Sequence, residues 1–98
     1  MSWRFIEGAL REYLSALAYY DEISLKLADR FASEFRASMA YLCVHPTVGL
    51  LGPRSTRRRR LRSFPYIIVF RDSGDQIDVL AVAHERRGDD YWEFVFER

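Results

Sequence analysis

The sequence predicts an α+β fold in which a helical hairpin packs on a small antiparallel β-sheet. Two observations lead to this prediction. In the first half of the chain, apolar residues recur at steps of three and four, as they do on one face of a helix. In the second half, short apolar runs are separated by Gly and Pro, which is typical of strands joined by turns. The 98 residues, 49% of them hydrophobic, suit one compact unit, so we predict a single domain over residues 1–98.

The first predicted helix runs from Glu7 to about Ile23, and a second helix follows it to about Val44. Ser24 is the predicted N-cap of the second helix, because a serine side chain accepts a hydrogen bond from the backbone of the first helical turn. In the first helix the residues at helical spacing are Leu10, Tyr13, Leu14, Leu17 and Tyr20. In the second helix they are Leu27, Ala28, Phe31, Phe35, Met39 and Leu42. Two amphipathic helices with so short a link form a hairpin whose apolar face needs cover.

Three strands are predicted to supply this cover, over residues 57–63, 66–72 and 76–84. Pro46 ends the second helix, and a Gly- and Pro-containing loop leads to the first strand. The last two strands are apolar at successive positions, so both of their faces are apolar and they belong inside the sheet. The first strand is mostly arginine. We predict that it forms an edge of the sheet, where charge is tolerated and deters pairing with other chains.

The formal net charge of +1 conceals a strong asymmetry along the chain. Residues 1–53 have five basic and six acidic side chains, residues 54–62 have six arginines, and residues 63–98 have four basic and eight acidic side chains. The positive potential is therefore concentrated in one segment. Cys43 is the only cysteine, which excludes an internal disulfide and a cysteine-based zinc site. No apolar run approaches the ~18 residues of a membrane span, and no signal peptide is evident, so we expect a cytoplasmic protein without a membrane partner.

The order of these elements resembles a known family. Two helices followed by three strands, with the middle strand entered by "FPYIIVF" and the last one closed by "VLAVAHERRGDDYW", resemble the RelE/ParE superfamily of bacterial type II toxin-antitoxin systems. The ParE or plasmid-stabilisation branch is the most similar. The resemblance covers almost the whole chain. It implies a βααβββ fold, in which Ser2 to Phe5 supplies the first strand.

The same resemblance implies a toxin that a cognate antitoxin silences, a small ParD-like DNA-binding protein with a segment that folds onto the toxin. It implies no cofactor and no metal. ParE-like toxins act on DNA gyrase, and the ending "AHERR" favours that branch. We therefore expect a growth inhibitor that binds gyrase without a catalytic step. The residues that we predict to contact the target are Arg58, Arg60, Arg62, Arg86 and Arg87.

A RelE-like toxin, which cuts mRNA on the ribosome, is the alternative. Metal-free cleavage requires a base for the 2′-OH, cations for the phosphate and an acid for the leaving oxygen. Arginine suits the phosphate because its planar fork makes paired hydrogen bonds. The candidates for such a site are Arg62, Arg71, His84, Arg87 and Tyr91. No spacing among them requires this chemistry, so whether the protein is an enzyme stays open at this point.

Plainer roles also fit several of these residues. The arginine run can be a solvated edge strand, and His84 can hydrogen-bond the turn that follows it. A small nucleic-acid-binding module ranks last, because no aromatic residue is interleaved with the arginines to stack on bases. Three large aromatic residues near the end of the chain predict an apolar patch that an antitoxin segment, or otherwise a second copy of the chain, covers. They are Trp92, Phe94 and Phe96.

Overall fold

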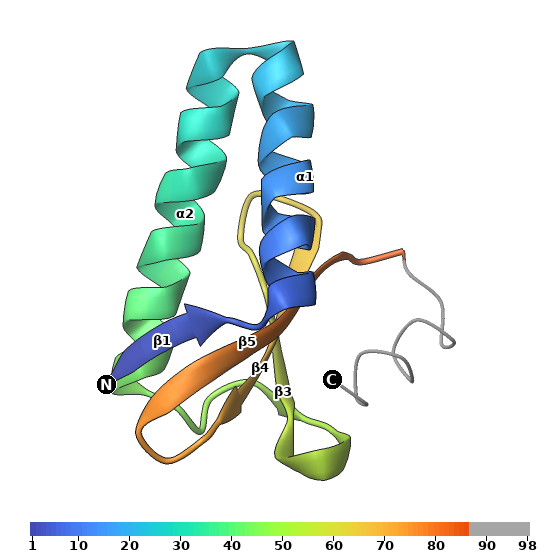
Figure 1. The fold of residues 1–98 in the computed structure, drawn as a ribbon. Coiled ribbons are helices and arrows are strands. Elements are labelled where there is room, and N and C mark those ends of the chain that lie inside the picture. Colours follow the sequence, from blue (N-terminus) through green and yellow to red (C-terminus); the bar gives the residue numbers. More distant parts are fainter. Residues whose placement is uncertain (87–98) are drawn as a thin grey trace.

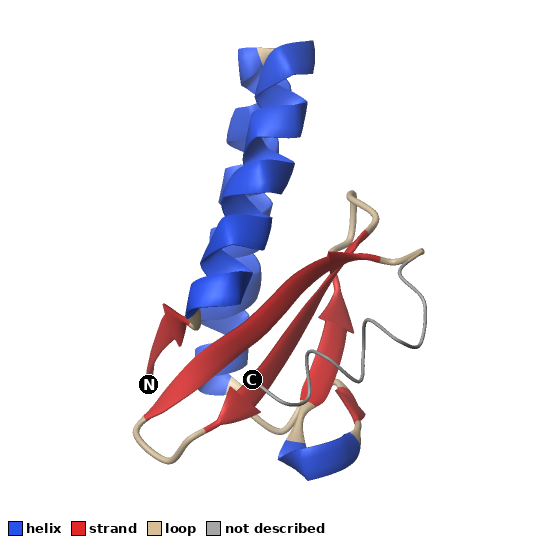
Figure 2. Cartoon of the chain, turned by 45° about the vertical axis from the view of Figure 1, so that its right-hand side comes forward, coloured by secondary structure: helices blue, strands red, loops and turns tan. Residues whose placement is uncertain are grey.

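The computed structural model of the protein describes residues 1–86 and contains two helices on one face of a five-stranded sheet (Figures 1 and 2). The strand order in the sheet is β1-β5-β4-β3-β2, with β1 parallel to β5 and the other neighbours antiparallel. The predicted α+β class and βααβββ order are confirmed. The elements are β1 (Ser2–Phe5), α1 (Glu7–Ile23), α2 (Leu25–Val44), β2 (Leu50–Leu51), the 3-10 turn η1 (Pro53–Ser55), β3 (Arg57–Arg60), β4 (Tyr66–Asp72) and β5 (Gln76–His84).

The two helices begin and end where the sequence predicts. Ser24 separates them, and its side-chain oxygen accepts a hydrogen bond from the backbone N–H of Leu27 at 3.0 Å. This bond satisfies one of the donors that the first turn of a helix leaves without a partner. Because the link is a single residue, the helices lie side by side as a hairpin, and the tip of the hairpin extends well beyond the sheet (Figures 1 and 2).

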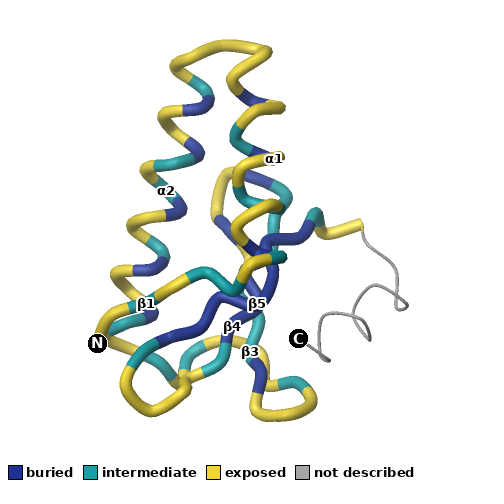
Figure 3. The backbone as a smooth tube through the Cα atoms, viewed as in Figure 1, coloured by how far each residue is buried: buried dark blue, intermediate teal, exposed yellow. Residues whose placement is uncertain are grey.

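The apolar stripe of α2 is buried as predicted, along the side of the helix that faces the rest of the molecule (Figure 3). The stripe predicted for α1 is partly wrong, because Leu10 and Leu14 remain 41% and 51% exposed. The buried residues of α1 are Ala9, Ala16 and Tyr20. Alanines carry little side-chain bulk, so this face of α1 can approach β5 closely. The prediction relied on large apolar residues alone, and in α1 these residues lie on a face next to the one that is buried.

Both faces of the central strands are apolar, as the sequence predicts. Ile68 and Phe70 of β4 join the main core with α2, whereas Val69 lies in a second cluster on the opposite face. The register of β4 against β5 shifts between Val69 and Phe70, which leaves Leu80 as an extra residue in β5. This bulge places Leu80 and Ala81 together in the second cluster, where Ile6 also packs. The apolar patch predicted for Trp92, Phe94 and Phe96 lies outside the described residues.

The prediction that the arginine-rich strand forms the sheet edge is wrong. Leu50 and Leu51 form a short strand, β2, which pairs with Arg58 and Arg57 of β3. The loop approaches β3 closely at Gly49, where φ is +100° and an added Cβ would lie 2.9 Å from the carbonyl oxygen of Arg58. Only glycine combines this conformation with this contact. A two-residue strand has no periodicity to detect, so the sequence pattern did not show it.

Candidate target-binding site at the basic end of the sheet

The arginines of β3 are divided between the two faces of the sheet. Arg57 and Arg59 lie opposite Phe70 and Ile68, which face the helices. Arg58 lies opposite Val69 on the second face, and Arg60 shares that face by alternation. The run is therefore not one continuous positive strip. Its members have different environments and different partners.

Arg60 and the residues around it form what we call the basic end of the sheet. It comprises Arg60, Arg62, His84, Glu85 and Arg86, which meet where β3 and β5 end and β4 begins. Figure 1 shows the β3–β4 link and the end of β5 at the same end of the sheet. Strand pairing between Tyr66 and His84 produces this arrangement. Four of the sequence-predicted site residues are thus brought together.

Arg60 is held by internal contacts. Its Nε donates to Glu85 Oε2 at 2.7 Å, and its Nη1 donates to the carbonyl oxygen of Leu61 at 2.8 Å. The hydrogen bond from Arg60 keeps the pKa of Glu85 below its ordinary value. A further hydrogen bond of 2.9 Å, from the Glu85 N–H to the Pro65 carbonyl, fixes the turn that presents Glu85. Arg60 therefore has a structural role beside any contact with a target.

Arg62 is exposed and is held between two anchors in the link from β3 to β4. Leu61 is buried, and its N–H donates to the Tyr66 carbonyl at 2.9 Å. On the other side of Arg62, the Ser63 N–H donates to Glu34 Oε2 of α2 at 3.0 Å. Within residues 1–86 Arg62 forms no ion pair. Like Arg86, it is a predicted contact residue that is exposed and forms no ion pair in this part of the chain.

A hollow of about 530 Å³ lies between α2 and the end of β3. Arg59 crosses it, with its guanidinium carbon 4.5 Å from the centre of the Tyr41 ring. Such a cation–π contact is worth about 0.5–1 kcal/mol at an exposed site and restricts the orientation of the arginine. We call this cavity the arginine hollow. It is lined by Glu34, Ala37, Ser38, Tyr41, Arg59, Arg60, Arg62 and Ser63.

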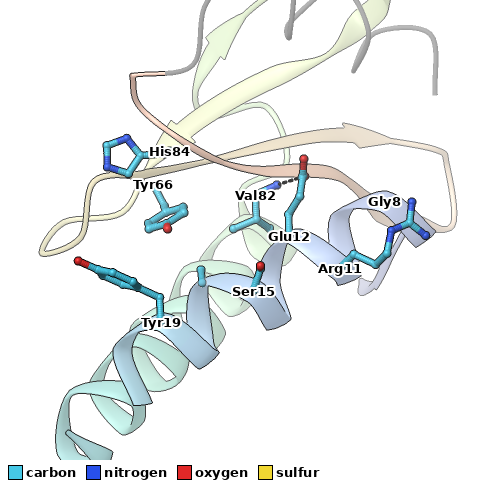
Figure 4. Close-up of a pocket in the computed structure, with 9 residues that line it drawn as sticks. Gly8, Arg11, Glu12, Ser15, Tyr19, Tyr66, Val82 and His84 are labelled. Atoms are coloured by element: carbon cyan, nitrogen blue, oxygen red, sulfur yellow. Dashed lines mark hydrogen bonds between the residues drawn. The ribbon is translucent and has the colours of Figure 1, made fainter. Parts of the chain in front are cut away.

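His84 lies in a separate cleft of about 490 Å³ between α1 and the ends of β4 and β5. Its Nδ1 accepts the Arg86 N–H at 3.2 Å, and its ring meets the Tyr66 ring edge-on with 5.4 Å between centres. Figure 4 shows His84, Tyr66 and Tyr19 together at one end of the cleft. Further along the cleft, Glu12 Oε1 accepts the Val82 N–H at 3.0 Å (Figure 4). The bond from His84 to the following turn matches the plainer role that the sequence allowed.

Of the residues suggested for ribonuclease chemistry, the fold brings Arg62 and His84 to the same end of the sheet but not Arg71. Arg71 lies opposite Asp78, five positions along β4 from Tyr66 and thus about 16 Å from the His84 end. It also lies on the opposite face of the sheet from Tyr66, because side chains alternate along a strand. Arg87 and Tyr91 lie outside the described residues. Within residues 1–86 the predicted set therefore supplies Arg62 and His84 at one end of the sheet, in separate pockets, and Arg71 at the other end.

Four residues that matter at these sites were missed by sequence analysis, namely Glu12, Glu34, Tyr41 and Glu85. A signal existed for two of them. Glu34 and Tyr41 are seven residues apart in α2, with Ala37 and Ser38 between them, so the four residues share one helical face. That face borders the arginine hollow. Glu12 and Glu85 depend on the strand register, which the sequence alone does not determine.

Residues 1–86 lack two features, a membrane-spanning helix and a metal-binding cluster. No helix in this part of the chain is long and apolar enough to span a membrane. Nor does it contain a cluster of three or more His, Cys, Asp or Glu side chains arranged to hold a metal ion.

A helical hairpin on one face of a small, mostly antiparallel sheet is the arrangement that the resemblance to the RelE/ParE superfamily implies. The family model of the ParE toxin of type II toxin-antitoxin systems, parDE, matches residues 5–88. The chain therefore belongs to the ParE toxin family. Among solved structures, a chain described as "Chromosomal ParDE TA system from P. aeruginosa" is similar, with a TM-score of 0.71 and 17% sequence identity over 86% of this chain and 95% of that one. At this identity the similarity concerns the fold. No curated protein matches the chain closely enough to count as a relative.

Proposed function

We propose that the protein inhibits growth by binding DNA gyrase, without a chemical step of its own. Membership of the ParE toxin family makes it the toxin of a type II pair whose antitoxin is of the ParD kind. That the target of this toxin is gyrase goes beyond family membership and is the part that we propose. We place the action in the cytoplasm, where gyrase acts on DNA, and we assign target contact to the basic end of the sheet.

The observation that supports this proposal is the presentation of Arg62. Anchors on both sides hold its backbone, and its side chain is exposed without an ion pair in residues 1–86. Preorganised cations at a surface steer association and select partners by charge. Arg60 and Arg86 lie at the same end of the sheet, so the surface carries more than one positive charge.

The alternative, a ribosome-dependent ribonuclease, receives less support. General acid–base catalysis requires proton donors and acceptors within hydrogen-bond reach of the reacting atoms. His84 already accepts the Arg86 N–H, and Arg71 lies at the opposite end of the strand pair. We therefore expect His84 to position the β5 end and not to transfer protons.

The antitoxin contact is proposed for the outer side of the helical hairpin. An apolar groove of about 370 Å³ runs between α1 and α2 near their tip. Leu14 and Leu25 line it and remain exposed. The helix-in-groove mode, in which an amphipathic helix places its apolar face in such a groove, is a common form of recognition. This assignment separates the antitoxin contact from the basic end.

The test of the proposal is growth inhibition by variants produced without antitoxin. Arg62→Glu is expected to abolish inhibition with an unchanged melting temperature, because substitution of an exposed residue usually changes stability by less than ~0.5 kcal/mol. His84→Ala is expected to keep inhibition. Lys26→Gln, an exposed residue at the other end of α2, is the charge control. Loss of inhibition in folded His84→Ala, with inhibition kept by Arg62→Glu, would reject the proposal.

A further inference from the structure

The arginine hollow carries positive charge that the nearby carboxylates do not neutralise. Glu34 accepts the Ser63 N–H, and Glu85 is paired with Arg60. Neither forms an ion pair with Arg59 or Arg62 in residues 1–86. These two guanidinium groups therefore remain available to an anion.

The Arg59 guanidinium and the Arg62 backbone are positioned before any ligand arrives. Arg59 is stacked on Tyr41 at 4.5 Å. The backbone of Arg62 is fixed between buried Leu61 and the hydrogen bond from Ser63 to Glu34. A site whose donors are already ordered loses less entropy on binding, which favours affinity.

The lining of the arginine hollow fits a phosphate backbone better than an acidic protein. Apart from its three arginines it offers the hydroxyls of Ser38 and Ser63, the Tyr41 ring and one carboxylate, that of Glu34, which accepts the Ser63 N–H; its aliphatic contribution is Ala37. Protein interfaces centre on large apolar or aromatic anchors that fill pockets, and this hollow provides no apolar pocket for one. Phosphate oxygens need only cations and donors, and arginine binds them in pairs of hydrogen bonds.

The aromatic ring at the hollow also distinguishes between nucleic acids. Single-stranded RNA is held largely by bases stacked on exposed aromatic faces. Tyr41 is the aromatic residue that lines the hollow, and Arg59 lies over its ring. Duplex DNA keeps its bases stacked within the helix and presents a regular row of phosphates. The arginine hollow therefore suits the phosphate backbone of a duplex, which it would bind without sequence preference.

We propose that the arginine hollow binds the phosphodiester backbone of duplex DNA through Arg59 and Arg62. The inference deepens the proposed function and rests on it for its biological setting: a toxin bound to gyrase contacts the DNA that the enzyme holds as well as the enzyme. The DNA contact itself does not require gyrase. It can be measured with the toxin alone.

The experiment is a fluorescence anisotropy titration of a short labelled DNA duplex at salt concentrations between about 50 and 200 mM. Wild type is compared with Arg59→Gln/Arg62→Gln and with Lys26→Gln/Arg36→Gln, which removes the same charge from exposed positions of α2 outside the hollow. Each phosphate contact contributes about −0.9 to the slope of log K against log salt. The hollow variant is therefore expected to have a slope shallower by about two and an affinity lower by about tenfold at low salt. The control variant should keep the wild-type slope.

The inference is overturned if wild type does not bind the duplex at the lowest salt, or if both variants lose slope and affinity equally. Circular dichroism confirms beforehand that both variants are folded. Tighter binding of single-stranded RNA or of polyglutamate than of the duplex also overturns it, because either result assigns the hollow to another class of partner. Gyrase inhibition by a wild-type protein that does not bind DNA rejects this inference and leaves the proposed function standing. DNA binding without gyrase inhibition rejects the proposed function and leaves this inference standing.

Discussion

Phe35 of α2 shows how single residues hold this fold. Its ring is buried and meets the rings of Trp3, Phe5 and Tyr13, with centres 5.8, 5.6 and 4.7 Å away. These partners come from β1 and α1, so one side chain joins three elements. Phe35→Ala is expected to lower the free energy of unfolding by about 3–5 kcal/mol, because it removes buried apolar surface and leaves a cavity. Urea denaturation measures the change.

The control for this substitution is Val44→Ala near the end of the same helix, where the side chain is 72% exposed. Exposed substitutions of this kind change stability by less than ~0.5 kcal/mol. A loss of similar size in both variants would contradict the placement of Phe35 in the core.

The ion pair between Arg60 and Glu85 predicts a pH dependence. The hydrogen bond from Arg60 lowers the pKa of Glu85 in the folded protein. A carboxylate of this kind stabilises the fold at pH values above its ordinary pKa of about 4.3, and the contribution is lost as the pH falls through the lower, folded-state value. Glu85→Gln is therefore expected to lower the melting temperature slightly at pH 7 and to match wild type at acidic pH. An equal gap at both pH values would contradict the pairing.

At the scale of elements, the sequence predicts α1, α2, β4 and β5 almost to the residue. Their signals are long and periodic, or apolar on both faces, and a serine or a glycine marks where each link lies. The errors concern the missed strand β2, the end of β3, which was predicted at residue 63 and lies at Arg60, and the buried face of α1. A two-residue strand is stabilised by its neighbouring strand and not by its own composition. The buried face of α1 is set by Ala9 and Ala16, whose small side chains contribute little to a hydrophobicity pattern.

The helical hairpin is the element to which we assign the antitoxin. Leu14 lies in the groove between α1 and α2 and is half exposed. Leu14→Glu places a charge in this groove, so the affinity for the cognate antitoxin is expected to fall by about tenfold, or about 1.4 kcal/mol. Val44→Glu adds the same charge away from the groove. Calorimetric titration with purified antitoxin measures both, and equal affinities of the two variants would place the antitoxin elsewhere.

At the scale of the whole molecule, the candidate site was only partly predictable. The charge asymmetry identifies the arginine run, and pairing of β4 with β5 explains why His84, Glu85 and Arg86 lie beside its end. The split of the run between two faces, the partner of Arg60 and the stacking of Arg59 on Tyr41 depend on register and on contacts distant in sequence. These are tertiary facts. Sequence reasoning therefore identified the arginine-rich segment but not the contacts of its individual arginines.

The central claim, gyrase inhibition without a chemical step, is tested most directly by adding the purified protein to a DNA supercoiling reaction of gyrase and, in parallel, to a translation extract in which mRNA is mapped for cuts. We predict that supercoiling is inhibited by wild type and by His84→Ala, that Arg62→Glu inhibits it less, and that no codon-dependent cuts appear. Normal supercoiling together with cleavage of ribosome-bound mRNA would contradict the account and identify the protein as a ribonuclease.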